Sequence, residues 1–185
     1  MSLEHAILGF LQYRPLSGYE LKKVFDASVR HFWAADQSQI YRTLARLAEQ
    51  GLAEVEVVEQ TDRPDRKVYH ITEAGRGELA RWLRQPPAME PPRSAPLIQV
   101  FFAGQMSDEE VLAFFRRGAD MMRGLLKSYD GVPEASRPYL EMAGSEREAT
   151  FWLLTLELGR KVAQAKLEWM ESVIERLEKG QVPQA

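Results

Sequence analysis

The chain has 185 residues, a net charge of −3, 45% hydrophobic residues and 28% charged residues. These proportions are typical of a folded soluble protein and exclude disordered and fibrous classes, and the length allows one or two domains. The chain has no cysteine, which excludes disulfides and thiolate metal sites and indicates a cytoplasmic location. No apolar run approaches the roughly 20 residues of a membrane helix, so we expect no membrane partner.

Two helices are predicted near the start of the chain. Apolar residues recur at helical spacing over residues 3–11. Ser17 is a suitable N-cap for a second helix over residues 18–28, in which Lys22 and Lys23 are expected to face water.

A third helix is predicted to begin after Asp36, because Gln39 follows three residues later in the register of a capping box. Gly51 is well placed to end this helix, since glycine readily adopts the left-handed conformation that follows a helix. On a helical wheel the buried side is expected to consist of Ile40, Leu44 and Leu47.

A β-hairpin should follow the third helix. Residues 52–60 and 67–72 alternate between apolar and polar side chains, and the turn between them contains a proline. Residues 73–85 return to helical spacing. The order of three helices, a hairpin and a fourth helix is that of a winged helix, a variant of the helix-turn-helix in which the third helix enters the major groove.

Five prolines lie within "PPAMEPPRSAP". Proline lacks an N–H and restricts the residue before it, so neither a helix nor a central strand can continue through this run. We therefore expect a winged-helix domain over residues 1–85, a linker over residues 86–96 and a second domain over residues 97–185.

The second domain is predicted to be entirely α-helical, which makes the fold mainly α with one small hairpin. Ser107 and Glu110 form one capping-box pattern, and a final helix is predicted from Glu146 to Lys179. We interpret this long helix as a dimerisation helix, with packing inside the chain as the alternative. Its interface positions would be Trp152, Leu156, Gly159, Ala163, Met170, Val173 and Leu177.

The third helix also carries candidate DNA contacts. Arg42 and Arg46 are predicted on its exposed face, where cationic side chains can bind phosphate, and short polar groups near its start can read bases. Two tyrosines either contact the DNA backbone or flank the core. The candidates are Tyr19, Gln37, Ser38, Gln39, Tyr41, Arg42 and Arg46, with Arg63, Arg66 and Lys67 in the wing.

No catalytic motif is present, so we expect no enzyme activity and no cofactor. His5, His31 and His70 lack metal-ligand spacing, and a structural role is expected for each. The aromatic residues of the second domain either form its core or leave an apolar cavity for a planar small molecule.

The segments "ILGFLQYRPLSGYELKK", "SQIYRTLARLAEQGLAE" and "RKVYHITEAGRGELARWL", followed by "LEWMESVIERLE", resemble the longer PadR-family transcriptional regulators. The resemblance covers nearly the whole chain, with the motifs in the family's order. It implies a homodimeric repressor that binds a pseudo-palindromic operator in double-stranded DNA and is released by a small aromatic or lipophilic effector. A protein-interaction adaptor without DNA affinity is the alternative function.

Overall fold

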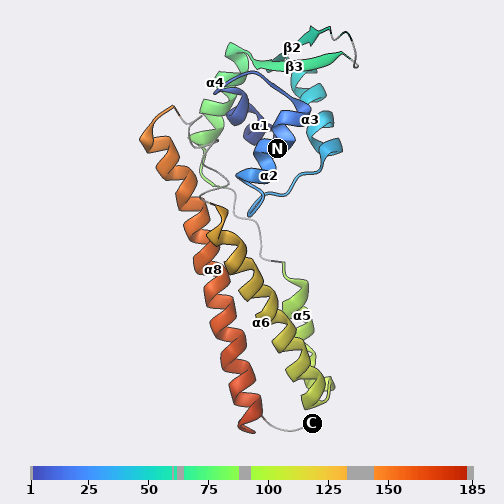
Figure 1. Cartoon of the computed structure of the whole chain (residues 1–185), viewed down its shortest axis with the longest axis vertical. Coiled ribbons are helices and arrows are strands. Elements are labelled where there is room, and N and C mark those ends of the chain that lie inside the picture. Colours follow the sequence, from blue (N-terminus) through green and yellow to red (C-terminus); the bar gives the residue numbers. More distant parts are fainter. Residues whose placement is uncertain (1, 60, 62–64, 88–92, 133–143, 183–185) are drawn as a thin grey trace. The chain divides into compact units, whose positions relative to one another are not determined.

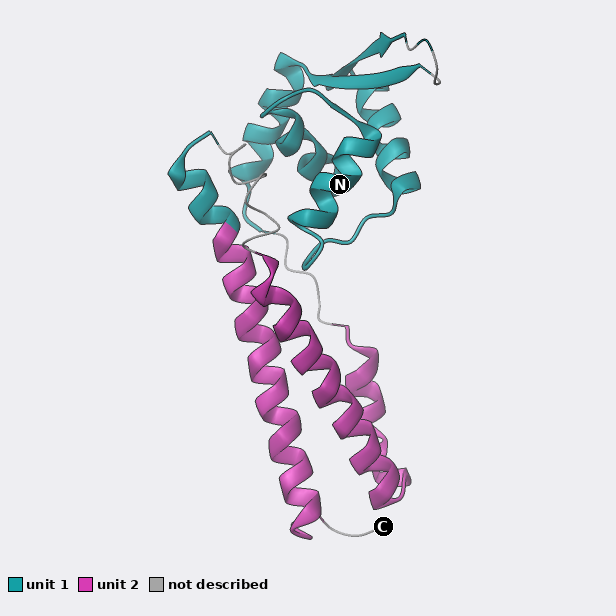
Figure 2. Ribbon diagram, in the orientation of Figure 1, with its two compact units in different colours: residues 1–87, 134–152 teal, residues 88–133, 153–185 magenta. Residues whose placement is uncertain are grey.

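The computed structural model describes two compact units, which are taken in turn (Figure 2). The first comprises residues 1–87 and 134–152, and the second comprises residues 88–133 and 153–185. None of the described helices combines the length and the apolar character needed to cross a lipid bilayer. Within these units the described residues are 2–59, 61, 65–87, 93–132 and 144–182.

The first unit is a winged helix, as predicted. Its third helix packs on the first and the second, and its fourth packs on the first (Figure 1). The elements are α1 (Ser2–Leu11), β1 (Leu16–Ser17), α2 (Gly18–Ala27), α3 (Gln37–Glu49), β2 (Ala53–Val58), β3 (Arg66–Ile71) and α4 (Glu73–Leu83).

Local hydrogen bonds explain where α2 and α3 begin and end. The Ser17 hydroxyl accepts from the Glu20 N–H while the Glu20 carboxylate accepts from the Ser17 N–H, and Asp36 and Gln39 form the same reciprocal box at α3. Gly51 has a φ of +70°, in the left-handed region that a residue with a side chain rarely adopts. The predicted caps and helix end are confirmed.

The sheet has a third strand that the sequence pattern did not indicate. β1 pairs antiparallel with β3, which also pairs with β2, so the strand order is β1-β3-β2. Ser17 lies opposite Val68 in this sheet and also caps α2. The start of α2 is therefore fixed against the wing.

The core of the first unit lies between α1, α2 and α3. The predicted stripe of α3 is confirmed, because Ile40, Leu44 and Leu47 are completely buried. Leu44 and its neighbours anchor α3 so that the opposite face of the helix is left in solvent. The other fully enclosed side chains of this core are Ile7, Leu8, Leu11, Leu16, Leu21, Val24 and Phe25.

The second unit is helical. Ser94 caps the first of its helices, which begins inside the segment predicted as linker. Pro96 is tolerated there because the N–H groups of a first turn have no partner within the helix. Residues 88–92 of that predicted linker lie outside the described residues. The elements are α5 (Ala95–Phe101), the 3-10 helix η1 (Ala103–Gln105), α6 (Asp108–Asp130) and α8 (Glu146–Glu178), the first turns of which belong to the first unit.

Three ion pairs join α6 to α8. The atoms in these pairs are 2.6 to 2.7 Å apart, and each pair links an arginine of one helix to a carboxylate of the other. Tyr129, Leu156 and Ala163 are buried beside them. Because the partners on α6 run forward while those on α8 run backward, the two helices are antiparallel. The pairs are Arg116–Glu178, Arg123–Glu171 and Arg160–Asp130.

Candidate nucleic-acid interface

The exposed face of α3 begins with three polar residues, two of which take part in the cap. The Ser38 hydroxyl donates to Asp36 Oδ1 at 2.7 Å, and Gln39 Oε1 accepts from the Asp36 N–H at 3.0 Å. The bonds from the Ser38 hydroxyl and the Gln39 N–H hold the pKa of Asp36 below its ordinary value. Gln37 is exposed next to them. A base contact by Ser38 or Gln39 would therefore compete with the helix cap.

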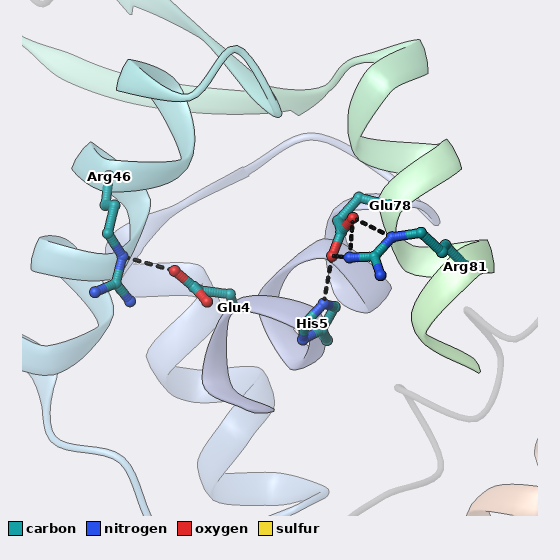
Figure 3. Close-up of polar contacts among 5 residues, drawn as sticks. All are labelled: Glu4, His5, Arg46, Glu78 and Arg81. Carbon is teal, nitrogen blue, oxygen red and sulfur yellow. Dashed lines mark hydrogen bonds and ion pairs between the residues drawn. The ribbon is translucent and has the colours of Figure 1, made fainter. Parts of the chain in front are cut away.

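The two arginines of α3 have different surroundings. Arg46 Nε lies 2.6 Å from Glu4 Oε1 on α1 (Figure 3). Arg42 Nε instead donates to the Ser38 carbonyl of its own helix at 3.4 Å. Glu4 is mostly buried, with 16% of its side chain exposed, while the Arg46 side chain is 52% exposed. A phosphate that bound Arg46 would have to compete with the carboxylate of Glu4.

Consecutive residues of α1 connect α3 to α4. Glu4 points to Arg46, and the next residue, His5, points to Glu78 on α4, with 3.0 Å between His5 Nε2 and Glu78 Oε1 (Figure 3). A hydrogen bond from Arg81, and to a smaller extent one from His5, holds the pKa of Glu78 below its ordinary value. His5 also stacks on Trp82, with 4.6 Å between ring centroids. His5 thus has the structural role expected of it.

A depression of about 550 Å³, here called the N-terminal hollow, lies between α2, α3 and the wing. It brings together four predicted DNA contacts that are far apart in the sequence. The ring of Tyr41 covers Gly18, where an added Cβ would lie only 2.6 Å from Tyr41 Cε1. The lining residues are Ser17, Tyr19, Glu20, Lys23, Tyr41, Asp65, Arg66 and Lys67.

Lys23 is a cation of this hollow that sequence reasoning missed. Its Nζ lies 4.5 Å from the centre of the Tyr19 ring, which is the geometry of a cation–π contact. The helical wheel predicted that Lys23 faces water. It could not show that this solvent-facing side chain lies beside residues of β3, because that requires β3 to pack near α2.

The cations of the wing also differ in whether they have an acidic partner. Arg66 lies 2.6 Å from Glu20, while Lys67 is exposed and, within the described residues, forms no ion pair. Lys23 likewise has no carboxylate partner in the described part of the chain. Arg63 lies outside the described residues. Acidic Asp65 shares the hollow with these cations.

Glu20 is expected to make the stability of the first unit depend on pH. Burial raises its pKa, but hydrogen bonds from the Ser17 N–H and hydroxyl and from Arg66 outweigh this and hold the pKa below its ordinary value. The unfolded chain therefore takes up the proton first, and the stabilisation is complete at neutral pH and is lost as pH falls through the lowered pKa. Urea unfolding of the wild type and Glu20→Gln should show a stability difference that shrinks on acidification. A difference that is constant with pH would contradict this.

Most residues of the predicted dimerisation stripe contact their own chain. Trp152 meets Tyr13 edge to face within the first unit, with 5.5 Å between centroids. In the second unit, Leu156 and Ala163 are buried beside α6, and Met170 covers Gly118. Their role in dimerisation stays a prediction. The remaining members, Gly159, Val173 and Leu177, are partly buried.

Two family models and several known proteins match this chain. The model of the transcriptional regulator PadR-like family matches residues 7–81, and the model of the virulence activator alpha C-terminal region matches residues 92–178. A probable transcriptional regulator of Mycobacterium tuberculosis is 33% identical, over 96% of this chain and 98% of its own. The chain belongs to the PadR-like family of transcriptional regulators. The PadR-like assignment confirms the predicted resemblance and makes the chain a regulator and not an enzyme.

Solved structures extend the match from the PadR-like sequence to the fold. The negative transcriptional regulator PadR of Bacillus subtilis is 29% identical, over 96% of this chain and 98% of its own. Its structure in complex with operator DNA has a TM-score of 0.82 at 26% identity, covering 96% of this chain and 99% of that one. Its structure with p-coumaric acid has a TM-score of 0.74 with the same identity and coverage.

Proposed function

We propose that this PadR-like regulator is a homodimer that represses transcription by binding a pseudo-palindromic operator in double-stranded DNA. We further propose that a small aromatic or hydrophobic effector releases it. The Bacillus subtilis relative is named a negative regulator, and it has been solved with operator DNA and with p-coumaric acid. These findings support the same class of partners for this chain.

The observation that carries the proposal is the set of cationic and polar side chains on the exposed face of α3 and in the N-terminal hollow. Lys23 and Lys67 line the hollow, Arg42 lies on the exposed face of α3, and none of the three forms an ion pair within the described residues. Such cations bind phosphates, and the tyrosine hydroxyls of the same hollow can donate to phosphate oxygens. A local field of this kind can attract DNA although the chain carries a net charge of −3.

Exposed apolar side chains on α8 support a homodimer. Leu154, Leu158 and Val162 follow at intervals of four residues, and they are 47%, 63% and 45% exposed. An apolar stripe of this kind on a helix is a common contact between copies of a chain. To bind two half-sites one turn of DNA apart, a two-fold dimer must present its two α3 helices about 34 Å apart.

Fluorescence anisotropy with labelled duplexes tests the proposal. DNA from upstream of the chain's own gene should bind more tightly than a shuffled duplex of equal length and composition. Equal affinity for both at low and moderate salt would contradict operator binding and favour the adaptor.

Glu4→Gln should strengthen DNA binding, because it removes the carboxylate that competes with phosphate for Arg46. Because the Arg46 side chain is 52% exposed, solvent screens the pair, and the expected gain in affinity is only about two- to fivefold. Glu49→Gln is the matched control, since it removes one negative charge from the exposed face of α3. If both substitutions raised the affinity equally, net charge would explain the effect and the specific competition by Glu4 would be rejected.

A further inference from the structure

We propose that a cavity between α5, α6 and α8 in the second unit, here called the three-helix cavity, binds an apolar organic anion. The ligand would have a hydrophobic body and one carboxylate or sulfonate group. The inference builds on the proposal that a small molecule regulates the chain, and it names the site and the chemical class of that molecule.

The size and walls of the three-helix cavity suit a small organic molecule. Its volume is about 550 Å³, within the range of roughly 300 to 1,000 Å³ typical of ligand pockets. The α-helices α5, α6 and α8 each contribute residues to it. The apolar side chains of its walls include Leu97, Val100, Phe114, Met122, Trp169 and Met170.

Methionines make these walls adaptable. Met121, Met122 and Met170 line the cavity, and methionine has an unbranched, polarizable side chain that packs against varied shapes. Gly118 leaves room for Met170, because a Cβ at this position would lie 3.0 Å from Met170 Sδ. The rings of Phe114 and Trp169 add flat apolar surface.

The charge of the lining selects an anion. Arg117 on α6 and Lys166 on α8 line the cavity, and among the described residues no aspartate or glutamate lines it. Within the described residues, neither cation forms an ion pair. Other cations of the same helices do: Arg116 binds Glu178, Arg123 binds Glu171 and Lys161 binds Glu157.

A mostly apolar wall that carries two cations favours a ligand that is hydrophobic along most of its length and negative at one end. A neutral apolar molecule would fill the walls but leave both cations without a partner. A small inorganic anion would satisfy the cations but bury no apolar surface. The cavity therefore fits an apolar organic anion better than either.

A pair of related dyes tests the assignment with the full-length chain. The probe is 8-anilinonaphthalene-1-sulfonate, an anion whose fluorescence rises in apolar surroundings, and the control dye is its uncharged analogue, N-phenyl-1-naphthylamine. Both should bind saturably and accept energy from tryptophan, since Trp169 lines the cavity. Arg117→Gln combined with Lys166→Gln should weaken binding of the sulfonate about tenfold and leave the neutral dye unaffected.

Two further variants sharpen the test. The single substitution Arg117→Lys keeps both positive charges of the cavity and should retain the affinity for the sulfonate. Arg42→Gln with Lys67→Gln removes two positive charges from the first unit and should leave both dyes unaffected.

Three results would overturn the inference. The first is no saturable binding of either dye, as expected if a second copy of the chain filled the cavity. The second is a sulfonate affinity that does not change in the double variant. The third is equal loss of both dyes, since the cations would then maintain the cavity without selecting an anion.

Parallel DNA titrations separate this inference from the proposed function. If the sulfonate binds as expected but does not change the affinity for DNA, the site stands and effector release fails. If the duplex from upstream of the gene binds no better than a shuffled one, operator binding fails regardless of the dye results.

Discussion

Replacing Gly75 with alanine should lower the free energy of unfolding of the first unit by about 3 kcal/mol, the upper range for overpacking a core. Gly75 is buried in the first turn of α4, and an added Cβ would lie 2.1 Å from the Leu52 carbonyl oxygen. That oxygen accepts from the Thr72 N–H at 3.2 Å, so it cannot withdraw without loss of a hydrogen bond. Chemical denaturation of the full chain measures the change.

Gly77→Ala is the matched control, two residues further along α4. Apart from its chain neighbours and the nearby backbone of its own helix, no described atom lies within 4 Å of a Cβ built there, and the residue is exposed. Because glycine in a helix interior is less favourable than alanine, this change should stabilise the unit by about 0.5 to 1 kcal/mol. The packing of α4 against Leu52 would be contradicted if the two substitutions had similar effects.

Arg42→Gln with Lys67→Gln should weaken DNA binding roughly 100-fold at moderate salt, since two charge-assisted hydrogen bonds to phosphate would be lost. Arg42 lies on α3 and Lys67 on the wing, and both are exposed. Neither substitution touches the buried core, so the chain should remain folded. Anisotropy titrations with the duplex from upstream of the gene measure the loss.

Arg117→Gln with Lys166→Gln supplies the control for net charge. It also removes two positive charges, but from the second unit, where no DNA contact is proposed. DNA affinity should fall by less than about threefold, because exposed charges more than about 10 Å apart are screened at physiological salt. Equal losses in the two double variants would show that net charge, and not the α3 and wing surface, controls the affinity.

The parts of the first unit that the sequence predicted are those set by nearby residues. The boxes at Ser17 and Asp36 each join residues three apart, and Gly51 ends α3 through its own backbone conformation. The buried stripe of α3 follows from helical spacing alone. Such signals are complete within a few residues, which explains why the helix starts were predicted correctly.

The missed features depend on residues that are distant in the sequence. β1 has only two residues and exists because Leu16 and Ser17 pair with β3. The contact of Arg46 with Glu4 likewise requires α1 to pack against α3. Periodicity places a side chain on a helix face but does not reveal which other element that face meets.

The long α8 helix shows the same limit. Helical spacing correctly identified Leu156 and Ala163 as apolar positions of one stripe, but spacing alone could not show that α6 of the same chain buries them. Leu154, Leu158 and Val162, which remain exposed, were absent from the predicted stripe. An amphipathic helix with apolar residues on more than one face has no sequence signal that assigns each face to its partner.

The salt dependence of DNA affinity tests the central claim most directly, because its slope counts the phosphates that the protein neutralises. We predict that a plot of log affinity against log salt for the duplex from upstream of the gene is flatter by about two units in Arg42→Gln with Lys67→Gln than in the wild type. Arg117→Gln with Lys166→Gln should keep the wild-type slope. A slope that is the same in all three proteins would contradict DNA binding through α3 and the wing.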